Sequence, residues 1–318
     1  MAPDRLAALH RVAAVESIGA SSRLDGGKLG GLAVEWLVGF GPGTKVLGGR
    51  DEQEAAGYAE ALEAILRTWQ TATLSQTYIR QLHRDLLAHS DKTTWHRGNY
   101  KNLPNPIPAL DADGKQAGIL FETASPFDTP RLMTELTAWR AAAREQRQLH
   151  PLLLIAVFNA VFLEIHPMQE GNGRLARLLT TLLLQQAGYA YIPYASLDGV
   201  LEQDRAGYLQ ALRQTQTTIR RPAPDWQPWL LFFLRALHRQ MQGLAATLER
   251  EKAVLRRLPD LSLRVVDHAR EHGRVSVGDM IRLTGASRNT LKQQLRLLVD
   301  NGHLARHGGG RSTWYTLP

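Results

Sequence analysis

The sequence predicts a mainly α-helical protein that carries one small β-hairpin and ends in a separate, shorter module. Apolar residues recur at helical spacing over much of residues 51–257. A proline-rich stretch with a turn signal interrupts them at 98–128. From about residue 260 the expected helices become short and the end of the chain is rich in glycine. The hydrophobic fraction of 44% is enough for a sizeable core.

The helical part is expected in five stretches, 51–70, 74–90, 129–147, 151–164 and 224–257, the last of which holds two helices. The stretch 151–164 is apolar on nearly every side, which predicts a helix buried all round. The stretch 98–128 is different, because three prolines lie within five residues and "DADG" follows as a hairpin-turn signal.

Composition limits both the chemistry and the expected location of the protein. The absence of cysteine excludes disulfides, thiolate nucleophiles and cysteine-bound zinc, and it fits a reducing cytosol. We find no signal peptide at the N-terminus and no window near the roughly 20 apolar residues that span a bilayer. We therefore expect a cytoplasmic protein with no membrane partner. The net charge of +8 favours a polyanionic partner.

Residues 166–177, "HPMQEGNGRLAR", gather polar groups directly after the apolar helix 151–164. His166 precedes a proline, so it should end that helix and begin a loop. The next helix is expected near Gly173 with Asn172 as its N-cap. Gly171 and Gly173 would then flank a turn at a helix N-terminus, where free N–H groups and the helix dipole favour a phosphate.

The charged residues of this run point to chemistry on that phosphate. Arg174 and Arg177 are three apart and can add charge-assisted bonds to one anion. Glu170 is a lone carboxylate in a positive site, which a Mg²⁺ ion between carboxylate and phosphate would explain. His166 can accept a proton from an attacking hydroxyl. Singly, each feature is more often an ordinary turn or a solvated helix face; together they indicate a site.

This run resembles the signature of the Fic family, His-Pro-Phe-x-Asp/Glu-Gly-Asn-Gly-Arg-x-x-Arg, with Met168 in place of phenylalanine. The resemblance implies a Fic-type helical bundle and transfer of AMP from ATP to a protein hydroxyl. It implies His166 as the general base and Glu170 as the Mg²⁺ ligand. The nucleotide-binding residues it implies are Gly171, Asn172, Gly173, Arg174, Arg177 and, by similarity of 197–212 to the segment that covers the adenine, Tyr208.

The stretch 18–29, "IGASSRLDGGKL", resembles the N-terminal inhibitory motif of one Fic class. Ser21 matches it, and Asp25 stands where the motif has glutamate. In the family that glutamate pairs with an arginine, here Arg174, and blocks the γ-phosphate. Because aspartate is one methylene shorter, we expect a longer, weaker contact and leaky autoinhibition. The alternative is an ordinary turn rich in serine and glycine.

The hairpin at 98–128 resembles the Fic flap, which aligns a target segment by adding it as a strand. This resemblance implies that the Ser, Thr or Tyr hydroxyl of a target protein docks at the flap. The alternative is a plain surface hairpin.

Residues 275–317 resemble a winged helix-turn-helix. We expect Ser287 as the N-cap of the second helix and the glycine-rich end as a two-stranded wing. Residues 263–318 hold nine Lys/Arg and four Asp/Glu, a net +5. The candidate DNA contacts are Arg288 and Asn289 for base edges and Lys292, Arg306 and Arg311 for phosphates. Such modules also serve as docking units, so a homodimer is the alternative partner.

The sequence is thus divided into four parts. These are an N-terminal inhibitory-helix segment (1–50), a Fic core (51–225), a helical connector (226–260) and a winged helix-turn-helix (261–318). The leading hypothesis is a protein adenylyltransferase that uses ATP and Mg²⁺. The alternatives are a DNA-binding regulator with a nucleotide-sensing Fic core, and a Fic enzyme that removes AMP or uses another nucleotide donor.

Overall fold

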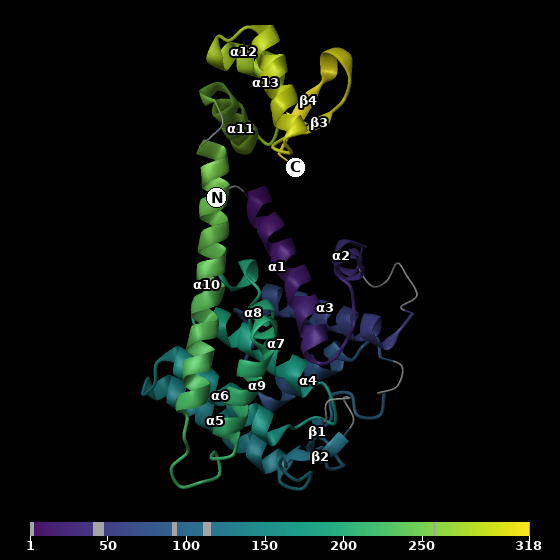
Figure 1. Ribbon diagram of the computed structural model, residues 1–318, viewed down its shortest axis with the longest axis vertical. Helices are drawn as coiled ribbons and strands as arrows, with labels where there is room; N and C mark the ends of the chain where they lie inside the picture. Colours follow the sequence, from purple (N-terminus) through teal and green to yellow (C-terminus); the bar gives the residue numbers. More distant parts are fainter. Residues whose placement is uncertain (1–2, 41–47, 91–93, 111–115, 257–258, 318) are drawn as a thin grey trace. The chain divides into compact units, whose positions relative to one another are not determined.

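The computed structural model describes residues 3–40, 48–90, 94–110, 116–256 and 259–317 (Figure 1). The chain divides into two compact units. The larger unit is His10–Met241, and the smaller unit combines Met1–Leu9 with Gln242–Pro318. Among the described residues, we find no helix with the length and apolar character needed to cross a membrane.

The larger unit is built mostly from helices that correspond to the expected stretches. In chain order the helices up to residue 216 are α1 (Pro3–Leu24), α2 (Gly31–Phe40), α3 (Arg50–Thr68), α4 (Gln76–Leu86), α5 (Thr129–Gln146), α6 (Pro151–Ile165), α7 (Asn172–Gln186), α8 (Leu197–Gln203) and α9 (Arg205–Gln216). A 3₁₀ turn, Ile192–Tyr194, lies between α7 and α8.

Helix α6 lies at the centre of this unit and packs against α5, α7 and α9. Its consecutive residues Leu154, Ile155 and Ala156 point in directions about 100° apart and are all buried, which confirms the prediction of a helix buried all round. A buried helix of this kind gives its C-terminal end a fixed place in the core. The loop that begins at His166 therefore starts from a rigid support.

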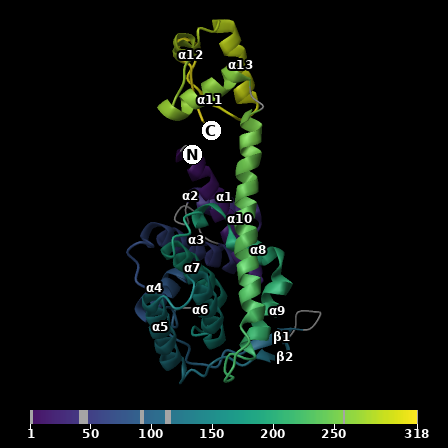
Figure 2. The same cartoon turned by 90° about the vertical axis from the view of Figure 1, so that its left-hand side faces the viewer.

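The two helical stretches expected within 224–257 are a single helix, α10 (Gln227–Arg256), which Figure 2 shows as continuous. Its prolines explain the difference. Pro222 and Pro224 precede the helix, and Pro228 lies in its first turn, where the missing N–H costs no hydrogen bond. No proline follows inside the helix, so nothing in the sequence breaks it.

The hairpin consists of β1 (Ile107–Leu110) and β2 (Gln116–Phe121), which pair antiparallel at one end of the helical bundle (Figures 1 and 2). The register pairs Ile107 with Phe121 and Ala109 with Gly118, with two irregularities along the strands. The expected turn "DADG" falls at residues 111–114, which lie outside the described residues.

The smaller unit has its own hydrophobic core, which includes Val265, Met280, Leu291, Leu295 and Leu298. Its elements are α11 (Asp260–His272), α12 (Val277–Thr284), α13 (Arg288–Asp300), β3 (Ala305–His307), a 3₁₀ turn (Gly310–Ser312) and β4 (Trp314–Thr316). Strands β3 and β4 pair antiparallel.

The turn between α12 and α13 has the expected chemistry. Gly285 ends α12 at φ 69°, a left-handed conformation that glycine adopts without steric cost. Ser287 is the N-cap of α13, and its hydroxyl accepts a hydrogen bond from Thr290 N, as predicted. The smaller unit therefore has the order helix, turn, helix, hairpin.

Candidate functional site

A cavity of about 340 Å³ joins the end of α1, the flap base, the loop after α6 and the start of α7. The predicted site residues that line it are His166, Gly171, Asn172, Gly173, Arg177, Asp25 and Tyr208. They come from segments up to 183 residues apart in the sequence, and the fold brings them to one place. Glu170 and Arg174 belong to the same loop and helix turn.

His166 is the C-cap of α6 and has φ 53°, a left-handed conformation that is unusual for a residue other than glycine. Its Nδ1 lies 3.4 Å from the Leu163 carbonyl oxygen. A carbonyl can only accept, so Nδ1 carries the hydrogen and Nε2 is left as the acceptor. Burial and, to a smaller extent, the charge of Lys101 lower the pKa of His166 to about 4. The ring is therefore neutral at pH 7 and able to take a proton.

The start of α7 differs from the prediction in its capping residue. Helix α7 begins at Asn172 with Gly171 as N-cap, and Gly171 has φ 74°. The Asn172 side chain does not cap the helix. It bonds twice to Met168 instead, accepting from the backbone N–H and donating to the carbonyl, both at 2.8 Å. A tertiary hydrogen-bond pair in a buried loop outweighs the local capping preference, because Met168 is fully buried.

Gly173 lies where no larger residue fits without movement. A Cβ at this position would lie 3.1 Å from Asp25 Oδ1 and 3.2 Å from Arg177 Nη1. The two glycines therefore leave the backbone N–H groups at the N-terminus of α7 open to close approach, as phosphate binding requires.

Arg174 and Arg177 are both buried, and carboxylates occupy both guanidinium groups. Arg174 Nε lies 3.2 Å from Asp25 Oδ2, and Arg177 Nη2 lies 3.0 Å from Asp25 Oδ1. The expected contact between Asp25 and Arg174 is thus present. This ion-pair distance is short, but Arg174 Nε makes no hydrogen bond of good geometry, so the expectation of a weaker contact stays a prediction. The same carboxylate also accepts a hydrogen bond from Arg177 Nη2 at 3.0 Å.

Two further carboxylates complete this arrangement, and the sequence analysis missed both. Glu54 Oε2, from α3, lies 3.1 Å from Arg174 Nη1. Asp198 Oδ1, from α8, lies 3.3 Å from Arg177 Nε. Burial raises the pKa of Asp198 to about 6, although the Arg177 charge opposes that shift. Nothing in the local sequence around Glu54 or Asp198 marks them, since each acts through residues more than 20 positions away.

Ser21 holds the other side of Arg177, and its side chain is fully buried. The Ser21 hydroxyl accepts a hydrogen bond from Arg177 Nε at 2.9 Å, and the Ser21 carbonyl accepts one from Nη2 at 3.1 Å. Ser21 and Asp25 therefore contact the same arginine from the last turn of α1 and the residue after it.

Arg174 is held less well than Arg177. Its Nε and Nη1 atoms are buried and close to Asp25 and Glu54, yet neither makes a hydrogen bond of good geometry. A buried guanidinium without well-formed hydrogen bonds is costly. Phosphate oxygens would satisfy these donors, so the group fits an anionic ligand.

Glu170 keeps an accessible carboxylate beside the glycine turn, with 28% of its side chain exposed. Arg50 Nη2 donates a long hydrogen bond to its Oε2 at 3.5 Å, and His96 Nε2 lies 3.8 Å from its Oε1. His83 fixes the Glu170 backbone: Gly98 N donates to His83 Nδ1, so Nε2 carries the hydrogen and donates to the Glu170 carbonyl at 3.1 Å. One available carboxylate beside a phosphate turn is a donor set that suits Mg²⁺.

Tyr208 lines the cavity from α9 but packs inward. Its ring centroid lies 5.9 Å from that of Trp229 and 6.0 Å from that of Phe232. The residues beside it in the cavity wall are Leu209 and Leu212. Tyr208 is therefore a wall of the cavity, and its stacking on an adenine stays a prediction.

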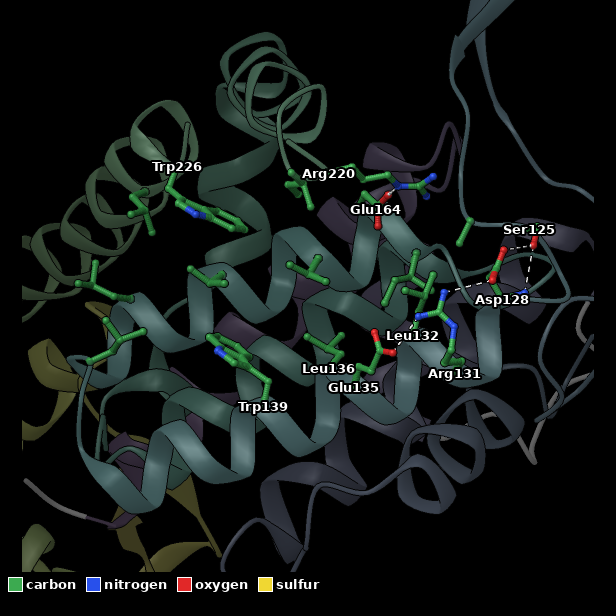
Figure 3. A pocket seen from close by; sticks show the side chains of 18 residues that line it. Ser125, Asp128, Arg131, Leu132, Glu135, Leu136, Trp139, Glu164, Arg220 and Trp226 are labelled. Atoms are coloured by element: carbon green, nitrogen blue, oxygen red, sulfur yellow. Dashed lines mark hydrogen bonds and ion pairs between the residues drawn. The ribbon is translucent and has the colours of Figure 1, made fainter. Parts of the chain in front are cut away.

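A larger groove of about 780 Å³ lies between α5, α6 and residues 219–230, and it does not contain His166 (Figure 3). Trp139 and Trp226 face it at one end, and the Glu164–Arg220 ion pair lies at the other. Its lining is mostly aliphatic and aromatic, with no group suited to phosphate chemistry apart from Arg131 and Arg220 at its edge. The chemistry of the site therefore belongs to the smaller cavity.

The predicted DNA-contacting residues lie in the smaller unit. Arg288, Asn289 and Lys292 are exposed on the first turns of α13, and Arg306 is exposed on β3. The side chain of Arg311 lies outside the described residues. Four of the five predicted contacts are thus available to solvent.

Comparison with known proteins matches two parts of the chain to families. Residues 73–184 match the Fic/DOC family, and residues 261–318 match the C-terminal domain of the transcriptional regulator DIP2311-like family. Among curated proteins, the chain is 25% identical over 212 residues to the protein adenylyltransferase Fic of Nematostella vectensis. It is 38% identical over 111 residues to that of Drosophila grimshawi. These matches cover 65% and 35% of this chain but only 42% and 20% of those relatives.

Solved structures show the same architecture. A Fic domain containing signaling protein from Bacteroides thetaiotaomicron VPI-5482 has a TM-score of 0.61 and 27% identity, covering 77% of this chain and 91% of that one. A Fic family protein from Desulfovibrio desulfuricans G20 has a TM-score of 0.62 at 21% identity, covering 97% and 87%, and shows the fold alone. The chain therefore carries a Fic domain, followed by a C-terminal domain of the kind found in a family of transcriptional regulators.

Proposed function

We propose that the protein transfers AMP from ATP to a hydroxyl side chain of a target protein or of itself. The observation that carries this proposal is the meeting of His166, the glycine turn and Arg177 around one cavity at the start of α7, where Arg174 belongs to the same helix. The names of the relatives support the same reaction, although the chain spans less than half of their length.

The reaction assigns a task to each group. The target hydroxyl oxygen attacks the α-phosphorus of ATP, the bond to the β-phosphate oxygen breaks, and pyrophosphate leaves. His166 Nε2, which faces the reaction as an acceptor, takes the hydroxyl proton. The N–H groups near Gly171 and Gly173 and the arginines Arg174 and Arg177 bind the phosphates and stabilise the charge of the leaving group.

Glu170 is the residue that would hold Mg²⁺ beside the phosphates. The ion would neutralise phosphate charge and orient the leaving pyrophosphate. The flap strands β1 and β2 would hold the target segment by strand addition. Because main-chain hydrogen bonds would then supply the affinity, many target sequences could bind. Tyr208, Leu209 and Leu212 form the wall on which the nucleoside would rest.

The N-terminal helix is proposed to restrain this activity. Asp25 places its carboxylate on the two arginines that the phosphates need, at 3.2 and 3.0 Å. An ATP phosphate must displace it, so the free energy of the two ion pairs is subtracted from that of ATP binding. Leakage then depends on how easily α1 moves.

Incubation with labelled ATP and Mg²⁺ tests the proposal with three proteins: wild type, His166→Ala and Asp25→Gly. We expect label on protein with the wild type, more with Asp25→Gly and none with His166→Ala. Label that persists in His166→Ala would contradict the role of His166. Equal labelling of wild type and Asp25→Gly would contradict the inhibitory role alone. An AMP-loaded target that loses AMP in the presence of the protein would favour the reverse reaction.

A second function, DNA binding, is favoured by the exposed cations on α13 and β3 and by the family match of residues 261–318. In this proposal Arg288 and Asn289 contact base edges while Lys292, Arg306 and Arg311 contact phosphates. The enzyme and the DNA-binding unit would then be two functions on one chain. A gel-shift assay with the His166→Ala protein separates them, because loss of transfer should leave DNA binding unchanged.

A further inference from the structure

Lys101 links the base of the flap to the loop that carries His166. It lies six residues before β1, and its side chain is only 3% exposed. Its ammonium donates three hydrogen bonds, to Asn105 Oδ1 at 2.7 Å, to Thr123 Oγ1 at 2.9 Å and to the Ile165 carbonyl at 3.0 Å. Asn105 precedes β1 and Thr123 follows β2, so one buried cation joins both ends of the flap to the residue before His166.

Asn105 and the backbone of Lys101 bind the rest of this loop. Asn105 Nδ2 donates to the Met168 carbonyl at 2.6 Å and lies 3.4 Å from the His166 carbonyl. Lys101 N donates to the Pro167 carbonyl at 2.9 Å. Two residues of the flap base therefore bind four consecutive carbonyls, those of residues 165–168.

This arrangement has a physical purpose at His166. The backbone of His166 is left-handed at φ 53°, a conformation that costs about 1–2 kcal/mol for a residue with a Cβ. Such a conformation persists only when the surrounding structure over-determines it. The four hydrogen bonds to the carbonyls of residues 165–168 hold the backbone of His166 in this conformation. Without them, we expect the loop to relax and the imidazole to turn away.

Burying an ammonium group costs free energy, and a neutral side chain could donate hydrogen bonds at a lower cost. Burial lowers the pKa of Lys101 to about 8, and the charged groups nearest to it are Glu164, which raises the pKa, and Arg220, which lowers it. Glu164 and Arg220 pair with each other at 2.6 Å (Figure 3). A buried ammonium at this place, beside the catalytic histidine, indicates that Lys101 does more than fill space in the core.

We propose that Lys101 and Asn105 are positioning residues that fix His166 and the flap in one rigid frame. We call the pair the flap clamp. The clamp sets the imidazole against the target hydroxyl, because the target strand and the proton acceptor are then held by the same two residues. This inference rests on the proposed adenylyl transfer for its effect on rate, but the positioning itself is a property of the loop.

The kinetic test compares Lys101→Met, Lys101→Arg and Asn105→Ala in an Asp25→Gly protein, with the exposed Lys28→Met as matched control. We expect kcat for AMP transfer to fall about 10- to 100-fold in Lys101→Met and Asn105→Ala, as for misplaced catalytic groups, with KM for ATP within about twofold. Lys101→Arg, which keeps the charge and donors, should recover part of kcat. The clamp is contradicted if kcat is unchanged in Lys101→Met and Asn105→Ala, or if these variants change only the KM for ATP.

The second readout does not need activity. In an NMR titration, the His166 imidazole is the resonance that His166→Ala lacks. Asn105→Ala removes no charge, so a shift of that resonance and of its titration midpoint reports a moved ring rather than a changed field. If the resonance and midpoint stay in place in Asn105→Ala and Lys101→Met, the clamp is wrong whether or not the protein transfers AMP. If they move while the background protein transfers none, the proposed function fails and the clamp stands.

Discussion

Helices α7 and α13 both carry basic side chains near their N-termini, but the two sets differ in burial and in ion pairing. In α7, Arg174 and Arg177 are 4% and 5% exposed and lie against carboxylates from three other elements. In α13, Arg288 and Lys292 are exposed, and we find no acidic partner for them in the described parts of the chain. The cations of α7 are thus buried and already paired with carboxylates, whereas those of α13 are exposed and have no acidic partner among the described residues.

The difference concerns what a ligand must do before it binds. A phosphate arriving at α13 displaces only water and counterions. A phosphate arriving at α7 must first remove Asp25, which directly follows α1, so its binding is coupled to a movement of the chain. The difference therefore separates the proposed nucleotide site, whose arginines already have internal partners, from the proposed DNA contacts, which have none among the described residues.

Neutralising Asp25 should have the largest effect on this contrast. We expect Asp25→Asn to raise the affinity for ATP by about tenfold or more, which is about 1.4 kcal/mol per factor of ten, because the two arginines lose the one carboxylate that contacts both of them. Isothermal titration with ATP and Mg²⁺ measures it. Asp267→Asn, a change at an exposed aspartate on α11, is the control, and equal affinities for the two variants would remove the distinction between α7 and α13.

Removing the exposed cations tests the other side of the comparison. We expect Arg288→Ala with Lys292→Ala to weaken DNA binding roughly fivefold at physiological salt and to lower the slope of log K against log salt by about one, because Lys292 is the phosphate contact of the two. AMP transfer should be unaffected. A fluorescence titration over several salt concentrations gives both quantities, and an unchanged slope would show that Lys292 meets no phosphate.

Glu54 should show a smaller version of the Asp25 effect. Its carboxylate holds only Arg174 in the site, and it also pairs with Arg50 on the exposed side. Glu54→Gln should therefore raise ATP affinity about threefold, in the range of a single partly screened ion pair. The double variant with Asp25→Asn should exceed either single change. A decrease in affinity would mean that Glu54 orients Arg174 for the phosphate rather than competing with it.

The pH response of His166 concerns the stability of the fold rather than the affinity for a ligand. Its pKa of about 4 lies below the ordinary value of 6.5, so the folded protein keeps this ring neutral while the unfolded chain binds a proton. Acidification from pH 6.5 toward 4 should lower the free energy of unfolding, and the stability is fully present above pH 6.5. Urea unfolding of wild type and His166→Asn over this range measures the difference, and parallel curves would contradict it.

Short-range patterns in the sequence predicted most of the secondary structure and the core of the site. The buried helix α6, the glycine turn after it and the Ser287 cap each depend on residues within one or two turns of each other. The run from His166 to Arg177 is contiguous, so its composition alone brought the base, the metal ligand and the arginines together.

The rest depends on contacts between distant segments. Glu54 and Asp198 reach the arginines from α3 and α8, and Lys101 and Asn105 reach the loop across more than 60 residues, and none of them follows a local pattern. Asn172 is a local exception, because its side chain bonds to Met168 four residues earlier instead of capping the helix. The contact of Asp25 with Arg177 as well as Arg174 depends on where α1 ends relative to α7, which no local pattern gives.

The left-handed backbone of His166 also decides how an inactive protein should be made. Alanine at this position removes the imidazole but keeps a Cβ without the polar side chain that eases such a conformation, so it can disturb the loop as well as the chemistry. Asparagine adopts the conformation more readily. His166→Asn is therefore the better inactive variant for trapping a bound nucleotide, because it should keep the loop intact.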